Sequence, residues 1–321
     1  MSAPLTPAVK AMQRATQASV VVAMTLALLK ILAVAETGAL SVLGSLLDTL
    51  LDVIASLVTL FAVRVATQPA DEDHRFGHGK AEAIAALFQT SLIMGSGVAL
   101  ILAAGNRLLH PHAVTEPGIG VGVSVFAILA TLALVTYQRH VARQTGSLAV
   151  DTDRLHYESD LGLNLSVIVA LGLESWAGIS GADAVFGIAI AAYLIWGAQK
   201  SARRAIDMLM DREWDERRRA QIVAAVAAHP DVRGIHELRT RTSGLDSFVQ
   251  FHIWLDPDLP VRRAHRIVDE VEGRVRAVFP DVEVLIHVDP EGVVEQGERD
   301  ADHRLLDPMS AASRLRSPRE G

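Results

Sequence analysis

Two aspartates lie inside an apolar stretch that is long enough to cross a lipid bilayer. Asp48 and Asp52 fall within the sequence LLDTLLDVIASLV, and the apolar character extends on both sides of it. A helix needs roughly 20 apolar residues to span the hydrocarbon core, and a charged side chain at its centre costs about 2.5–3.5 kcal/mol. Residues four apart face the same side of a helix, so ionised Asp48 and Asp52 would repel each other. Such a pair requires either a cation between the two carboxylates or protons on them.

The cation has two candidate sources. Lys30, in the preceding apolar stretch, could pair with the acids and simply lock two helices together. A metal ion is the preferred alternative, because His156 and Asp160 form a second pair four residues apart near the start of a later apolar stretch. With Asp48 and Asp52 they supply three carboxylates and one imidazole from two helices. That donor set suits a tetrahedral divalent ion, with zinc the leading candidate.

Half of the 321 residues are hydrophobic, which is high for a soluble protein. The hydropathy pattern predicts six membrane-spanning helices. The apolar stretches of these expected helices cover approximately Ala15–Ala35, Leu40–Val65, Ala83–Leu109, Gly118–Tyr137, Leu161–Ile179 and Ala184–Ala198. The fifth helix is expected to start earlier, near Leu155, because the polar residues before its apolar stretch have helical spacing.

Lysine and arginine concentrate before the first expected helix, between the second and third, between the fourth and fifth, and after the sixth. This asymmetry predicts that both termini are cytoplasmic. No basic block suggests a nucleic-acid partner. Cysteine is absent, so any metal chemistry must use histidine, aspartate and glutamate.

The chain changes character after the sixth apolar stretch. Residues 207–293 alternate between amphipathic helical segments and short strand patterns in the order αββαβ. We therefore expect four parts: a cytoplasmic N-terminus over 1–14, a six-helix transmembrane transport domain over 15–206, a cytoplasmic domain over 207–293, and a charged tail over 294–321. The tail has few large apolar residues, which predicts disorder.

Two further groups of histidines and acids have spacings that suit metal binding. The connection after the second helix contains Asp71, His74 and His78, which would converge in a turn; a solvated charged loop is the alternative. In the cytoplasmic domain, histidines and one aspartate fall on strands or their ends and on one helix. They are His236, His252, His265, His287 and Asp289. Each could be a surface residue, but their number in one small domain favours a metal cluster.

Several segments together resemble the cation diffusion facilitator family, and within it the bacterial zinc and iron efflux transporters of the FieF/YiiP type. They are LLDTLLD, QPADEDHRFGHGKAE, LHYESD, LMDREWDE, HELRTRTSG and IHVDP. The resemblance implies six transmembrane helices followed by a cytoplasmic αββαβ domain of the ferredoxin-like (metallochaperone-like) class. It also implies a homodimer in a bacterial inner membrane.

Carried over residue by residue, the resemblance assigns each group of side chains a role. The transport site would consist of Asp48, Asp52, His156 and Asp160, and the loop site of Asp71, His74 and His78. The cytoplasmic binuclear site would consist of His236, His252, His265, His287 and Asp289. A salt bridge near the dimer interface would join Lys80 and Asp211. Val288 departs from relatives that can carry a polar residue there, which puts one secondary ligand in doubt.

The expected function is therefore a secondary active transporter, not an enzyme, that exports Zn²⁺ in exchange for protons by alternating access. Ligand type also permits Cd²⁺, Fe²⁺, Co²⁺ or Mn²⁺. The alternative is a membrane-bound metal sensor or assembly scaffold without transport.

Overall fold

The computed structural model describes residues 6–37, 40–109, 120–177 and 182–292. The chain divides into two compact units, Met1–Leu209 and Met210–Gly321. The expected disordered tail over 294–321 lies outside the described residues, so its state stays a prediction.

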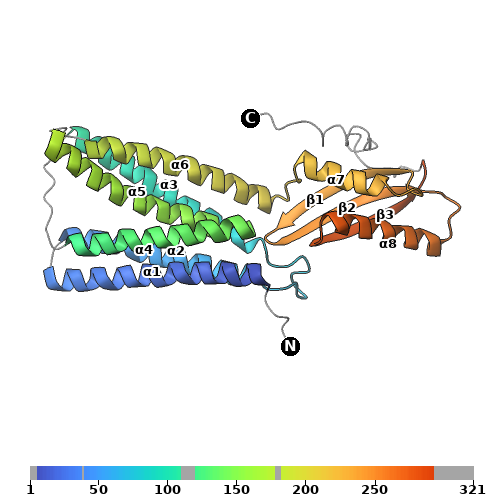
Figure 1. The fold of residues 1–321 in the computed structure, drawn as a ribbon, viewed down its shortest axis with the longest axis horizontal. Coiled ribbons are helices and arrows are strands. Elements are labelled where there is room, and N and C mark those ends of the chain that lie inside the picture. The colour runs from blue at the N-terminus through green and yellow to red at the C-terminus, as the bar shows by residue number, and fades with distance from the viewer. Residues whose placement is uncertain (1–5, 38–39, 110–119, 178–181, 293–321) are drawn as a thin grey trace. The chain divides into compact units, whose positions relative to one another are not determined.

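In the described part of the chain, the first unit consists of six long helices (Figure 1). Their bounds are α1 Pro7–Thr37, α2 Leu40–Ala66, α3 Ala81–Leu109, α4 Gly120–Thr145, α5 Leu148–Ala177 and α6 Ala182–Leu209. Among the described residues, five of these helices are long and apolar enough to cross a membrane. The exception is α5, which at 30 residues has the length but carries the charged segment VDTDRLHYESD in its first half.

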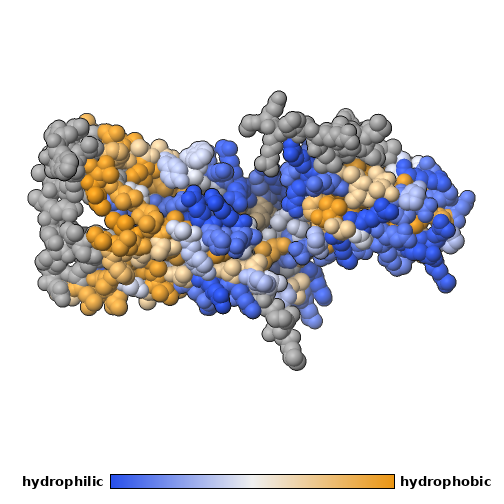
Figure 2. Space-filling view, viewed as in Figure 1, coloured by the Kyte–Doolittle hydropathy of each residue, from blue (hydrophilic) through white to orange (hydrophobic). Residues whose placement is uncertain are grey.

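The helical unit is apolar outside and more polar inside. Large apolar side chains such as Leu28, Phe61, Leu102 and Trp196 are exposed, and Figure 2 shows apolar surface gathered over one half of the helices. Many buried positions instead hold alanine, serine, threonine or glutamine. Lipid solvates the apolar surface as well as a protein core would, so small and polar residues are what hold such helices together.

Close approach of α5 and α6 depends on Gly197. A Cβ atom at this position would lie 3.0 Å from Leu155 Cδ1 and 3.1 Å from Leu155 Cδ2. The glycine therefore lets α6 pack directly against the turn of α5 that precedes His156.

The second unit is a three-stranded sheet with two helices. It follows the order α7 Glu216–Ala227, β1 Gly234–Ser243, β2 Asp246–Leu255, α8 Val261–Val278 and β3 Val282–Pro290. Strand β2 is central, antiparallel to β1 and parallel to β3. The predicted architecture of six transmembrane helices followed by an αββαβ domain is confirmed.

Alternation along the strands separates the two faces of this sheet. Val249, Phe251 and Ile253 of β2 point into the apolar core, which they share with Val223 of α7 and Val271 of α8. Residues between them on β2 point to the opposite face. That face carries His236, His252 and His287.

Candidate metal centres

The first centre lies between α2 and α5, inside the helical unit. Asp52 of α2 and His156 and Asp160 of α5 each offer one ligand atom, and these atoms all lie within 4.8 Å of one another. His156 Nε2 is 3.0 Å from Asp52 Oδ1. The i,i+4 spacing on α5 brings both of its ligands to the face that packs on α2. Two carboxylates and an imidazole in this arrangement can hold a divalent ion.

A cavity of about 240 Å³ opens beside these three residues. Asp48 and Lys30 line it together with Asp52 and Asp160. The Asp48 carboxylate does not lie within 4.8 Å of all three clustered ligand atoms. Lys30 Nζ donates to Thr49 Oγ1 over 2.6 Å. The structure thus brings together three of the four predicted transport ligands and leaves Asp48 on the wall of the same cavity.

Beneath this centre lies a buried polar network that the sequence analysis did not identify. Asp153, one turn before His156, is fully buried and accepts hydrogen bonds from three other helices. Its carboxylate contacts Ser19 Oγ at 2.6 Å, Gln138 Nε2 at 2.6 Å and Gln89 Nε2 at 2.8 Å. The network joins α1, α3, α4 and α5. Its signal in the sequence was an acid three residues before His156, with polar residues scattered in three apolar helices.

Tyr157 connects this network to the cavity. Its hydroxyl lies 2.7 Å from Ser56 Oγ on α2 and donates to the Ser19 carbonyl over 3.2 Å. The same tyrosine lines the cavity beside Asp52 and Asp160. The helices that carry the metal ligands are therefore tied to α1 beside the cavity.

The second centre lies in the connection between α2 and α3. The imidazole of His78 approaches Asp71 Oδ2 to 3.3 Å, and the rings of His74 and His78 lie 4.5 Å apart. Gly77, with φ of +75°, turns the chain between the two histidines. His78 Nδ1 is buried and has no hydrogen-bond partner among the described residues. All three predicted loop ligands converge.

The loop also keeps its carboxylate ionised. The backbone N–H of His74 donates to Asp71 Oδ1 over 2.6 Å, and this bond is the main reason that the pKa of Asp71 is lowered from its usual value. Desolvation opposes this effect, and the side chains of His74 and His78 lower the pKa of Asp71 further. A carboxylate that is ionised at neutral pH is ready to bind a cation.

The third centre lies on the open face of the second unit's sheet. His236, His252 and His287 are register partners on β1, β2 and β3, so they form one row across the sheet. Asp289 Oδ2 lies 2.9 Å from His252 Nδ1 and 3.2 Å from His236 Nε2. His287 Nε2 lies 3.1 Å from Asp289 Oδ1. Three of the five predicted ligands, His236, His252 and Asp289, therefore converge on one centre, and His287 lies beside it through its contact with Asp289.

A β-bulge adds a residue that the sequence analysis missed. The register shifts between His236 and Arg239, and Glu237 adopts a φ of +49°. The side chain of Glu237 is buried, with Oε2 3.8 Å from His252 Nε2. Strict strand alternation would have directed Glu237 away from His236, so only the bulge accounts for this carboxylate beside the cluster.

Two further predictions do not join this cluster. His265, on α8, is largely exposed, and its Nε2 atom lies 3.7 Å from Asp269 Oδ2. Within the chain it does not join the other predicted ligands. The predicted bridge from Lys80 to Asp211 would join the two units and stays a prediction. Within their own units, Lys80 Nζ donates to the Leu209 carbonyl over 3.3 Å, and Asp211 lies 3.7 Å from Arg241.

Comparison with known proteins finds similarity along most of the chain. A cation efflux transmembrane domain matches residues 16–210, and the cytoplasmic domain of cation efflux proteins matches residues 214–291. The cation-efflux pump FieF of Serratia proteamaculans is 44% identical over 285 residues, which is 89% of this chain and 95% of that protein. The FieF pump of Klebsiella pneumoniae is 44% identical over 286 residues, with the same coverage.

Among solved structures, the metal-bound C-terminal domain of the CzcD transporter from Thermotoga maritima is 30% identical. It covers 24% of this chain and 92% of that chain, with a TM-score of 0.24. The family models and the FieF relatives suffice for an assignment without it. The chain belongs to the cation diffusion facilitator family, and it is a membrane-embedded cation-efflux transporter rather than an enzyme.

Proposed function

We propose that this transporter exports Zn²⁺ from the cytoplasm in exchange for protons, by alternating access around Asp52, His156 and Asp160. The observation that carries the proposal is the convergence of these three side chains beside a cavity of about 240 Å³, inside a helical unit whose outer surface is largely apolar. Ionisable groups at membrane depth are costly and are placed where ions or protons pass. Asp48, on the wall of that cavity, is available as the fourth ligand after a side-chain rotation.

Proton coupling follows from the chemistry of the ligands. An imidazole and two carboxylates bind a metal ion only when they are deprotonated, so protons and Zn²⁺ compete for the same atoms. Facing the cytoplasm, the site releases protons and takes up the ion. Facing the more acidic outside, protons displace it. Protonation also removes the repulsion between the acids and permits the empty site to return.

The other two centres suit a sensing role. We propose that Zn²⁺ bound at the sheet cluster stabilises a homodimer in the bacterial inner membrane, with both termini cytoplasmic. His265, which stands apart from the cluster within one chain, would then serve a partner subunit. Metal can shift the transport cycle in this way only if it binds one dimer arrangement more tightly than the other.

The test is zinc uptake into proteoliposomes with and without an imposed pH gradient, for the wild type, Asp52→Ala and a matched control. Asp281→Ala is that control, because Asp281 is exposed and lies outside all three clusters. Gradient-driven uptake should persist in the control and disappear in Asp52→Ala. Parallel assays with Cd²⁺, Fe²⁺, Co²⁺ and Mn²⁺ rank the metals.

The alternative function is a membrane-bound metal sensor or scaffold. Under that alternative the wild type binds zinc and dimerises but carries no flux under any gradient. Flux that is unchanged in Asp52→Ala would equally refute the proposed transport site.

A further inference from the structure

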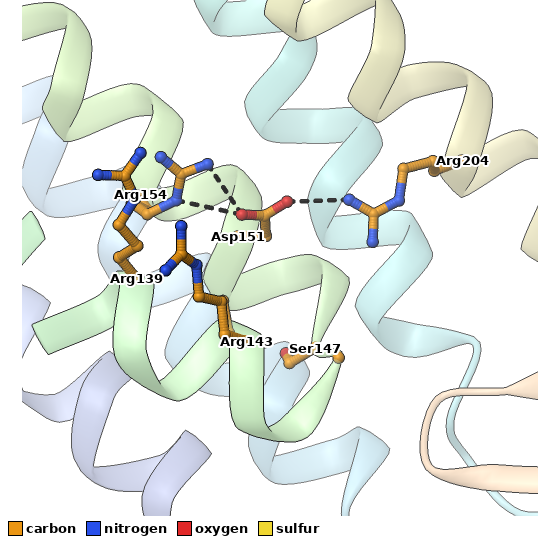
Figure 3. A pocket seen from close by; sticks show the side chains of 8 residues that line it. Arg139, Arg143, Ser147, Asp151, Arg154 and Arg204 are labelled. Carbon is orange, nitrogen blue, oxygen red and sulfur yellow. Dashed lines mark hydrogen bonds and ion pairs between the residues drawn. The ribbon is translucent and has the colours of Figure 1, made fainter. Parts of the chain in front are cut away.

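A second cavity, of about 250 Å³, lies where α4 ends and α5 begins. Four arginines line it, Arg139 and Arg143 from α4, Arg154 from α5 and Arg204 from α6, with Asp151 among them. In Figure 3 the guanidinium groups of Arg139, Arg143 and Arg154 gather on one side of the Asp151 carboxylate, and Arg204 approaches from the other. None of these residues belongs to a metal centre described above.

The cavity results from a very short connection between two helices. Gly146 has a φ of +69°, and its N–H donates to the Ala142 carbonyl over 2.9 Å, which closes the end of α4. Helix α5 then begins at Leu148. The left-handed conformation favours glycine, and the tight turn sets the last two turns of α4 against the first turns of α5.

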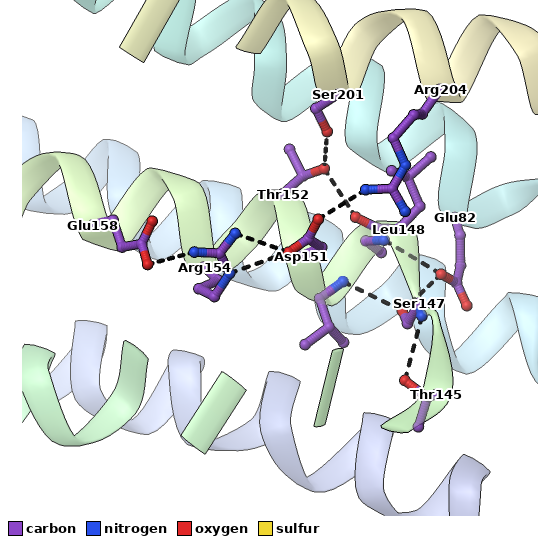
Figure 4. A network of polar contacts seen from close by, with 12 residues as sticks. Glu82, Thr145, Ser147, Leu148, Asp151, Thr152, Arg154, Glu158, Ser201 and Arg204 are labelled. Atoms are coloured by element: carbon purple, nitrogen blue, oxygen red, sulfur yellow. Dashed lines mark hydrogen bonds and ion pairs between the residues drawn. The ribbon is translucent and has the colours of Figure 1, made fainter. Parts of the chain in front are cut away.

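The available acids neutralise only two of the four arginines. Asp151 accepts from Arg154 Nη2 and from Arg204 Nη1, both over 2.9 Å, and Arg154 also pairs with Glu158. Figure 4 shows this chain of ion pairs running from Glu158 through Arg154 and Asp151 to Arg204. It ties α5 to α6, and it leaves no acid for the arginines of α4.

Arg139 and Arg143 are exposed, and neither makes a hydrogen bond or ion pair with any residue that the structure describes. Arg143 lies in the last turn of α4, where a positive charge suits the helix dipole. The dipole does not explain why two unpaired guanidinium groups face a cavity that already holds two more. Like charges in one place are unfavourable unless an anion joins them.

The position of the cavity indicates which anion is available. The candidate membrane span of α4 covers Val125–Thr145, so Arg139 and Arg143 lie in its last two turns, towards one edge of a bilayer that it crosses. Figure 2 shows the surface of the helical unit changing from apolar to polar towards the end where α1 begins. Basic pockets between helices at the cytoplasmic edge of a membrane suit the headgroups of anionic lipids.

We propose that Arg139 and Arg143, supported by Arg154 and Arg204, bind the phosphate group of an anionic phospholipid from the leaflet on the side of the N-terminus. Guanidinium groups bind phosphate oxygens through paired hydrogen bonds, which makes four of them around one cavity a good fit. The choice of the cytoplasmic leaflet rests on the orientation proposed above. The binding itself depends on neither metal nor transport.

The test is native mass spectrometry of the full-length protein in detergent, titrated with dioleoyl-phosphatidylglycerol or dioleoyl-phosphatidylcholine. Phosphatidylglycerol should bind in preference, and the Arg139→Gln/Arg143→Gln variant should lose affinity for it by roughly 30-fold. Arg64→Gln is the matched control, because Arg64 is an exposed arginine in the last turn of α2 and does not line the cavity. It should bind phosphatidylglycerol as the wild type does.

Two further arms separate the sources of the phosphate and guard against misfolding. Arg139→Lys/Arg143→Lys keeps both charges and should retain most of the binding, whereas a general loss of structure would abolish it. Inorganic phosphate at 10-fold excess over the lipid should not displace it; displacement would overturn the lipid source in favour of a free anion. Equal binding of both lipids, or undiminished binding by the Gln variant, would mean that these arginines are solvated charges only. Because the lipid titration contains no metal, a failure to bind phosphatidylglycerol would not affect the interpretation of the zinc-uptake experiment.

Discussion

Asp153→Ala is expected to destabilise the helical unit markedly, although Asp153 contacts none of the three metal centres. The side chain is fully buried, and hydrogen bonds from Ser19, Gln89 and Gln138 converge on it. If all three donors lost their acceptor, each unsatisfied donor would lower the free energy of unfolding by about 1–3 kcal/mol. The total is smaller because some of these donors have other acceptors nearby.

Two of the donors have other acceptors within reach. Ser19 Oγ lies 3.1 Å from the Ala15 carbonyl, and Gln89 Nε2 also donates to Thr59 Oγ1 over 2.5 Å. Gln138 has Ser19 Oγ at 2.9 Å for one of its two N–H groups and nothing further for the second. We therefore expect a net loss of about 3 kcal/mol. For a unit of this size that corresponds to a fall in Tm of roughly 6–12 °C.

The assay is thermal unfolding of the detergent-solubilised protein, followed by loss of the monodisperse size-exclusion peak. Asp73→Ala, an exposed aspartate in the same unit, is the control and should leave Tm unchanged. Asp153→Asn should fall between wild type and Ala, because Gln89 Oε1 has no partner and can accept from the new amide. A shift in Tm of 2 °C corresponds to a loss of at most ~1 kcal/mol of unfolding free energy. A Tm for Asp153→Ala within 2 °C of wild type would therefore refute the argument that this network holds the four helices together.

Two other predictions concern the second unit. Asp289→Ala removes the carboxylate shared by His236, His252 and His287, so added zinc should no longer raise the Tm of this unit; an unchanged zinc response would exclude Asp289 as a ligand. Partial desolvation, and secondarily the charge of Glu283, raises the pKa of Asp246, so its contribution to stability is present below about pH 4 and is lost as pH rises through the raised pKa. Asp246→Asn should flatten this dependence of Tm on pH, and a parallel pH profile in the variant would contradict the assignment.

The architecture was largely predictable because length and periodicity determine membrane helices. The apolar pattern alone predicts that the fourth helix ends near Tyr137, whereas α4 continues to Thr145. Hydropathy reports where lipid ends, not where backbone hydrogen bonding ends, and nothing stops that helix before Gly146. The fifth helix likewise begins at Leu148, well before its apolar stretch, because its charged turns are buried among other helices.

The candidate centres were predictable to the extent that they follow local spacing. His156 and Asp160 share a helix face through their i,i+4 relation, and His287 and Asp289 share a strand face through alternation. Glu237 could not be found this way, because a bulge reverses its direction. Asp153 depends on partners up to 134 residues away, which no local pattern contains. The separation of Asp48 from its neighbour Asp52 reflects packing between helices that spacing does not determine.

The measurement that tests the central claim most directly is anomalous X-ray diffraction at the zinc absorption edge, from crystals of the protein grown with Zn²⁺. The account predicts an anomalous peak bounded by Asp52, His156 and Asp160, with Asp48 turned in as the fourth ligand, and the loss of that peak in Asp52→Ala. Peaks confined to the loop and sheet centres, with none between α2 and α5, would contradict it.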